Sequence, residues 1–89
     1  MFTAQEAQAK IGRRIRSRVP FSGVPQGTTG RLVDADVARR RMQGDTVVEE
    51  GYDVVIQWDR SERLFGTVLK PLRDWFSKDE YEAFLLERE

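Results

Sequence analysis

Alternation of apolar and charged residues is the clearest pattern in the chain, and it predicts short β-strands. After Gly12, the apolar residues Ile15, Val19 and Phe21 share one parity, while arginines occupy positions between them. A period of two is typical of a strand with one buried side and one solvent-facing side. The segment YDVVIQWD, residues 52–59, repeats the pattern with β-branched and aromatic residues, and it is the clearest strand in the sequence.

Turn residues and two weaker strands complete the predicted sheet. Glycines and prolines concentrate in residues 20–30, where they provide turn chemistry. We expect a second strand at 30–34 and a fourth at 64–69, which Pro71 closes or breaks. Residues 35–51 are too many for a structureless connection in a small domain. The alternatives are a helical turn over 36–42 and an extended loop or hairpin arm, and the second is favoured.

Two segments carry the capping-box spacing that begins many helices. A Thr or Ser is followed three residues later by Glu, at Thr3 and again at Ser77. These signals predict a short helix within residues 1–11 and a C-terminal helix over 77–89. The second helix has an apolar stripe that should dock on the sheet, made of Tyr81, Phe84 and Leu85.

These elements predict one mainly β domain, a partly open barrel of about five strands over residues 12–75 with both helices added. The sequence resembles the small SH3-like barrels in three motifs: G-R-R-I-R at 12–16, P-Q-G-T-T-G-R-L-V at 25–33, and V-V-I-Q-W-D at 54–59. In that fold a glycine-led first strand, a P-x-G-T-x-G-x-V turn and a V-x-V-x-W-D strand recur in this order. The resemblance covers residues 12–70 and implies a fold that serves many unrelated functions.

Composition removes most of the common catalytic chemistry. The 89 residues include no cysteine and no histidine. Thiol nucleophiles and disulfides are therefore excluded, as are the commonest general base and metal ligand. We expect no catalytic, cofactor-binding or metal-binding residues. The beginning of the chain lacks a signal-peptide pattern, and no stretch approaches the roughly 18 apolar residues of a membrane helix. We therefore expect a cytoplasmic protein without a membrane partner.

Charge is balanced in total but graded along the chain. Residues 1–41 carry nine basic and three acidic side chains, whereas residues 74–89 carry two basic and six acidic ones. Arginine has a planar fork that suits carboxylates and phosphates. The candidate partner-binding residues are therefore the arginines of the first strand and of the 35–51 segment, with one aromatic residue beside a turn: Arg14, Arg16, Arg18, Arg39, Arg40, Arg41 and Trp75. The alternative is that these arginines have no binding role and protect an exposed strand against sheet-to-sheet aggregation.

Two functional hypotheses use these residues. The first is a non-enzymatic SH3-like binding or accessory module that acts in protein–protein interaction. The second is an RNA- or ribosome-associated barrel whose arginines bind phosphates. A net charge of zero favours the first, because nucleic-acid-binding domains are usually basic. Neither the identity of a partner nor the oligomeric state follows from the sequence.

The third hypothesis is a small homotetrameric enzyme, and it comes from a resemblance to an enzyme family. Glu50-Gly51-Tyr52 followed by Val54 is similar to the third-strand entry of the plasmid-type (type II) dihydrofolate reductases. Those are small SH3-like barrels that form homotetramers around a central pore. A V-Q-I-Y segment lines their pore, whereas residues 65–70 here read F-G-T-V-L-K. Because this departure removes the glutamine and the tyrosine, we transfer no catalytic residue to this chain.

Overall fold

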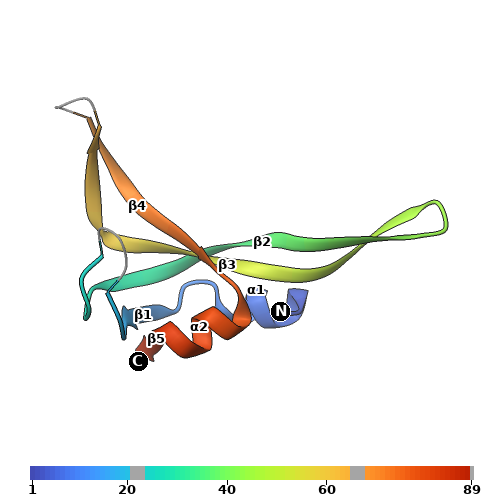
Figure 1. The fold of residues 1–89 in the computed structure, drawn as a ribbon, viewed down its shortest axis with the longest axis horizontal. Helices are drawn as coiled ribbons and strands as arrows, with labels where there is room; N and C mark the ends of the chain where they lie inside the picture. The colour runs from blue at the N-terminus through green and yellow to red at the C-terminus, as the bar shows by residue number, and fades with distance from the viewer. Residues whose placement is uncertain (21–23, 65–67, 89) are drawn as a thin grey trace.

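Five antiparallel strands and two short helices make up the protein in a computed structural model that describes residues 1–20, 24–64 and 68–88 (Figure 1). The predicted mainly β class with a helix near each end is confirmed. Along the chain the elements are α1 (Ala4–Lys10), β1 (Arg14–Ser17), β2 (Thr29–Gln43), β3 (Thr46–Leu64), β4 (Val68–Phe76), α2 (Lys78–Phe84) and β5 (Leu85–Arg88).

The strands form one sheet in the order β4-β3-β2-β1-β5. The last strand therefore returns to pair with the first, with Ser17 opposite Leu85. Strands β4 and β5 are the two edges, so the sheet is not closed.

The predicted C-terminal helix over 77–89 is wrong in its second half. Helix α2 ends at Phe84, and the chain continues as strand β5. Strand β1 pairs with β2 on one side, and its other edge needs hydrogen-bond partners. Four residues of β5 provide that pairing. Tertiary pairing thus overrides the local helical pattern.

Residues 35–51 form a hairpin arm, the favoured alternative of the sequence analysis. Strands β2 and β3 pair from Gly30–Trp58 out to Gln43–Thr46, and Gly44 and Asp45 form a two-residue turn. Gly44 has φ of +64°, a conformation that the tight hairpin turn requires and that glycine adopts readily. The arm extends away from the rest of the molecule (Figure 1).

The arm makes the protein elongated. Its extents are 49 × 32 × 20 Å, and its Cα radius of gyration is 14.8 Å. A compact domain of this length would have a radius of about 12 Å.

The predicted fourth strand over 64–69 is also misplaced. Strand β3 continues past the 52–59 segment to Leu64, and β4 runs from Val68 to Phe76. Pro71 lies within β4, opposite Ser61, and does not end it. An edge strand tolerates proline because one side of its backbone needs no ladder donor.

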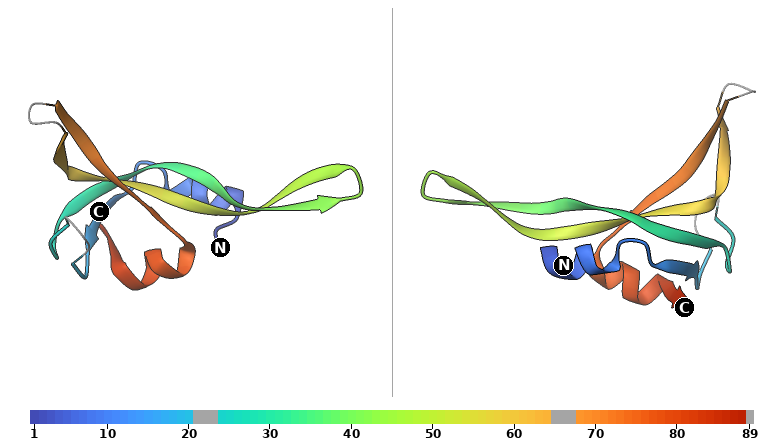
Figure 2. Two further views of the ribbon diagram at one scale, coloured as in Figure 1. Left: turned by 45° about the horizontal axis from the view of Figure 1, so that its top comes forward. Right: turned by 180° about the vertical axis from the view of Figure 1, so that it is seen from behind.

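Both helices lie on the same side of the sheet (Figure 2). Each begins with the predicted capping box, in which the Thr3 or Ser77 hydroxyl accepts from a backbone N–H three residues on. An ion pair of 2.9 Å between Lys78 Nζ and Glu6 Oε2 joins α2 to α1. The hydrogen bonds from the Thr3 backbone N–H and from Lys78 lower the pKa of Glu6 to about 2. The helices are thus linked by a charge pair as well as by packing.

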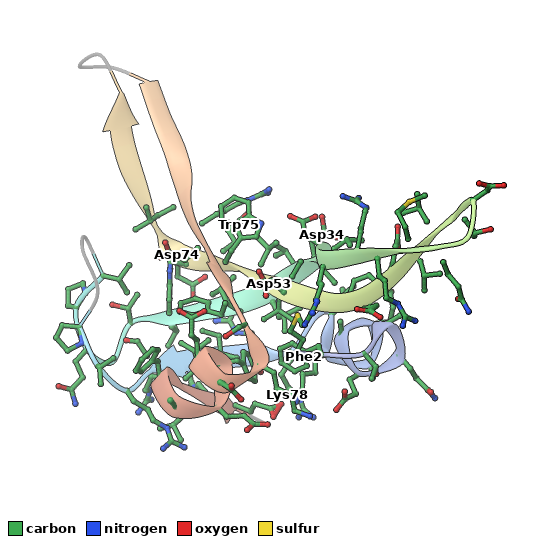
Figure 3. All side chains as sticks on the ribbon, turned by 45° about the vertical axis from the view of Figure 1, so that its right-hand side comes forward. Phe2, Asp34, Asp53, Asp74, Trp75 and Lys78 are labelled. Carbon is green, nitrogen blue, oxygen red and sulfur yellow. The ribbon has the colours of Figure 1, made fainter. Side chains whose placement is uncertain are left out.

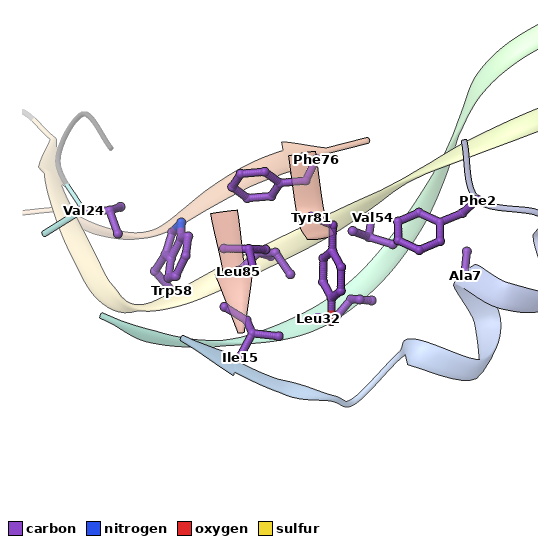
Figure 4. Packing of buried hydrophobic residues seen from close by; sticks show 11 residues of the cluster. Phe2, Ala7, Ile15, Val24, Leu32, Val54, Trp58, Phe76, Tyr81 and Leu85 are labelled. Atoms are coloured by element: carbon purple, nitrogen blue, oxygen red, sulfur yellow. The ribbon is translucent and has the colours of Figure 1, made fainter. Parts of the chain in front are cut away.

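Strand alternation separates an inner face, covered by the helices, from an outer face that no described helix covers. Figure 3 shows Trp75 and Asp34 on one side of the sheet, with Phe2 and Lys78 on the other. The inner side chains form the core, which packs between the sheet and the two helices (Figure 4). Its members are Phe2, Ala7, Ile15, Val24, Leu32, Val54, Ile56, Trp58, Phe76, Tyr81 and Leu85.

The core of the described chain contains four of the nine aromatic residues in the sequence: Phe2, Trp58, Phe76 and Tyr81. Trp58 is 2% exposed, as expected for the inward parity of its strand. Phe2 packs edge-on against Tyr81, with ring centroids 5.6 Å apart, and fixes the beginning of the chain to α2. Phe21 and Phe65, also considered from the sequence, lie outside the described residues.

Candidate binding surface on the outer face of the sheet

Five polar side chains form a row across all five strands of the sheet. Arg14 lies directly opposite Arg31 of β2 and Arg88 of β5. Gln57 of β3 lies opposite both Arg31 and Arg73 of β4. Directly opposite residues of paired strands point to the same side of a sheet. We call the four arginines, aligned with Gln57, the arginine row.

Neighbouring positions of the arginine row are close enough for their charges to interact. Paired strands lie about 4.7–4.9 Å apart. Within the described part of the chain, one member has an ion pair: Arg14 Nη2 is 3.1 Å from Asp59 Oδ2. Thr29 donates a hydrogen bond of 2.6 Å to the same carboxylate oxygen. Arg31 and Arg88 have no ion pair with any described residue, so the centre and one end of the row carry uncompensated positive charge.

The β1–β5 end of the outer face adds a fifth arginine. Arg16 lies two residues after Arg14, and its opposite residue on β5 is Leu86. An open, shallow groove of about 420 Å³ lies here, lined by Arg16, Leu86, Glu87 and Arg88. Leu86 is 42% exposed, so an apolar contact is available beside the guanidinium groups.

Trp75 lies on the outer face and spans β3. Its Nε1–H donates a hydrogen bond of 2.7 Å to Asp36 Oδ2, which joins β4 to β2. Val55 of β3 lies directly opposite Trp75 and is only 2% exposed, although it belongs to the outer face. The indole therefore covers Val55, while 54% of Trp75 remains exposed.

Carboxylates occupy the outer face beside Trp75 and beyond it, toward the arm. Asp36 and Asp53 lie directly opposite each other, and Asp34 is opposite Val55. Like charges placed opposite one another are unfavourable, and the indole N–H offsets part of that repulsion at Asp36. Among the described residues, no group of three acidic side chains is arranged to hold a metal ion.

The candidate residues chosen from the sequence fall in four separate places, three of them away from the arm. Arg14 and Arg16 are on the outer face, whereas Arg18 is exposed beyond the end of β1, with its backbone N–H bonded to Phe84 O. Trp75 is on the outer face, nearer the arm. The structure therefore does not bring these three groups of candidates together at one point.

The remaining candidates, Arg39, Arg40 and Arg41, lie on the arm. Arg41 Nε forms an ion pair with Glu50, and Arg39 Nε lies 3.6 Å from the same carboxylate. Arg40 is exposed and faces Glu49, the acceptor of the Tyr52 hydroxyl. These arginines do not share a patch with those of the first strand, because the hairpin carries them away from β1 (Figure 1).

Sequence reasoning did not find Arg31, Arg73 or Arg88. Arg31 and Arg73 each have the outward parity of their strand, but parity alone does not show which residues are neighbours across strands. Arg88 was assigned to a helix, so its place beside Arg14 was hidden.

Comparison of the chain with protein-family models, curated proteins and solved structures finds no match. Within the described residues, no helix is long and apolar enough to cross a membrane.

Proposed function

We propose that this protein is a non-enzymatic, SH3-like binding or accessory module of the cytoplasm that acts in protein–protein interaction through its outer face. One observation carries the proposal. Arg14, Arg31 and Arg88 are aligned on three adjacent strands, and two of them have no ion pair within the described chain. A surface of this kind attracts carboxylates and suits their bidentate recognition.

Two further features support an SH3-like binding module. The three motifs that resemble SH3-like barrels lead into β1, lead into β2 and lie within β3, respectively. The fifth strand returns to the first, as a small partly open barrel requires. The absence of histidine and cysteine from the sequence favours binding over catalysis.

The unpaired arginines also support a second candidate, in which the outer face binds RNA phosphates. Two features favour an acidic protein instead. The chain has no net charge, and carboxylates share the outer face with the arginine row. A dedicated nucleic-acid surface is usually strongly basic.

A pull-down from the native lysate, with and without nuclease, tests the proposal. The baits are the wild-type chain, an Arg14→Glu/Arg31→Glu/Arg88→Glu variant and a matched arm variant, Arg39→Glu/Arg40→Glu/Arg41→Glu. We expect the wild-type and arm baits to capture a protein even after nuclease treatment. The Arg14→Glu/Arg31→Glu/Arg88→Glu bait, called the row variant, should not capture it. Capture that requires nucleic acid and weakens steeply between about 50 and 200 mM salt would support the RNA candidate. Equal capture by all three baits would contradict both.

A further inference from the structure

The outer face carries three successive tiers of different chemistry along the strands. The first is the basic tier, in which Arg31 and Arg73 flank Gln57. The second is the apolar tier, formed by Trp75 over Val55. The third is the acidic tier, formed by the opposed pair Asp36 and Asp53. Asp34 is opposite Val55 and therefore lies level with the apolar tier.

The three tiers are evenly spaced. On the central strand β3 they fall at Gln57, Val55 and Asp53, so each tier is two residues from the next. Two residues of a strand span about 6.6–6.8 Å. An extended peptide laid along β3 has the same repeat between side chains on one side, so its alternate residues would meet successive tiers in step.

We propose that the outer face binds an extended segment of a protein partner that presents an acidic, an apolar and a basic side chain at alternate positions. This inference rests on the proposed function and specifies its partner. The acidic residue pairs with Arg31 and Arg73, the apolar residue packs on the exposed part of the Trp75 ring, and the basic residue meets Asp36 and Asp53. Charge complementarity sets both the order and the position of the bound segment.

The acidic tier distinguishes this partner from a polyanion. A chain of phosphates that followed the strands would leave the basic tier and meet Asp36 and Asp53 about 13 Å further on, where it would be repelled. A protein segment can change the sign of its charge over that distance. The aromatic ring between the two charged tiers also offers the kind of apolar contact that dominates many protein interfaces.

Selection from a random library of displayed linear peptides tests the inference. We expect enriched peptides with the order acid-x-apolar-x-base, and titration of the best one should change Trp75 fluorescence. Arg31→Glu/Arg73→Glu and Asp53→Lys should each weaken binding of that peptide at least about ten-fold, and Asp36 is left in place because it accepts the hydrogen bond from Trp75. The matched arm variant Arg40→Glu should bind the peptide unchanged. Circular dichroism and urea unfolding show whether each variant is folded, and Arg31→Gln/Arg73→Gln provides a second, milder test of the basic tier.

Three results would overturn the inference. Enrichment of uniformly acidic peptides that still bind the Asp53→Lys variant would show that the acidic tier plays no part, while leaving the proposed function intact. Oligouridylate that binds as tightly as the best peptide, and depends on Arg31 and Arg73, would show a phosphate-binding surface. If no peptide were enriched on the wild-type chain relative to the row variant, peptide recognition by this face would be contradicted.

Discussion

Trp75 Nε1 donates a hydrogen bond of 2.7 Å to Asp36 Oδ2, which joins strands β4 and β2 over the strand between them. The bond explains how an outward-pointing valine, Val55, is almost fully buried without a covering helix. It also places an exposed aromatic ring between the arginine row and the carboxylates Asp36 and Asp53.

The Trp75 contact should contribute to folding as well as to binding. Trp75→Ala uncovers Val55 and removes the donor to Asp36, so we expect the free energy of unfolding to fall by about 1–2 kcal/mol in urea denaturation. Trp75→Phe keeps an aromatic cover and removes only the donor, so its loss should be about half as large. Equal stability of the alanine variant and the wild type would show that the Trp75 ring does not stabilise the fold by covering Val55.

The hairpin arm should be dispensable for folding. Residues 38–50 contribute no side chain to the core, and an isolated two-stranded hairpin is only marginally stable. Val37 and Tyr52 lie opposite each other, so an Asn-Gly turn can replace residues 38–51 between them. We expect the shortened chain to unfold cooperatively, with a free energy of unfolding within about 1 kcal/mol of the wild type. Loss of the cooperative transition would show that the arm stabilises the sheet.

Gly30 should be intolerant of even one methyl group. A Cβ at this position would lie 2.9 Å from the Gln57 backbone oxygen and 3.1 Å from Trp58 Cε3. Because the first contact is with a paired strand, relief requires the strands to move, and we expect Gly30→Ala to cost about 1–3 kcal/mol. Gly51→Ala on the same hairpin is the comparison, since the nearest atoms to its methyl group all belong to the side chain of Met1, an exposed first residue, and none to a paired strand. Thermal unfolding of the two variants measures the difference. If Gly51→Ala were the less stable of the two, this packing would be contradicted.

The Glu6–Lys78 link should give the protein a specific acid sensitivity. The pKa of Glu6 falls from its ordinary value of 4.5 to about 2 in the folded chain. Its stabilising contribution is therefore complete above pH 4.5 and is lost as the pH falls through about 2. Glu6→Gln should lower the unfolding midpoint at pH 6 and reduce the further decline between pH 4.5 and 2. Identical pH profiles for Glu6→Gln and the wild type would contradict the link.

Local patterns predicted much of the fold, because period-two alternation and capping boxes are short-range signals. They placed Ile15, Trp58 and the beginnings of both helices correctly. The boundaries near Phe84 and Leu64 depend on pairing with distant strands, which local periodicity does not contain. The same limit applies to the candidate surface: Arg14 was recognisable as exposed, but its neighbours Arg31 and Arg88 follow only from strand register.

The central claim is that the protein binds its partner through the outer face rather than through the arm or the helices. The most direct measurement is the NMR spectrum of the isotope-labelled chain, recorded with and without the partner protein that the pull-down captures after nuclease treatment. We expect the arginine Nε–H signals of Arg31, Arg73 and Arg88 and the indole signal of Trp75 to shift, while signals of residues 39–48 stay in place. Shifts confined to the arm or to α1 and α2, with the arginine row unchanged, would contradict the account.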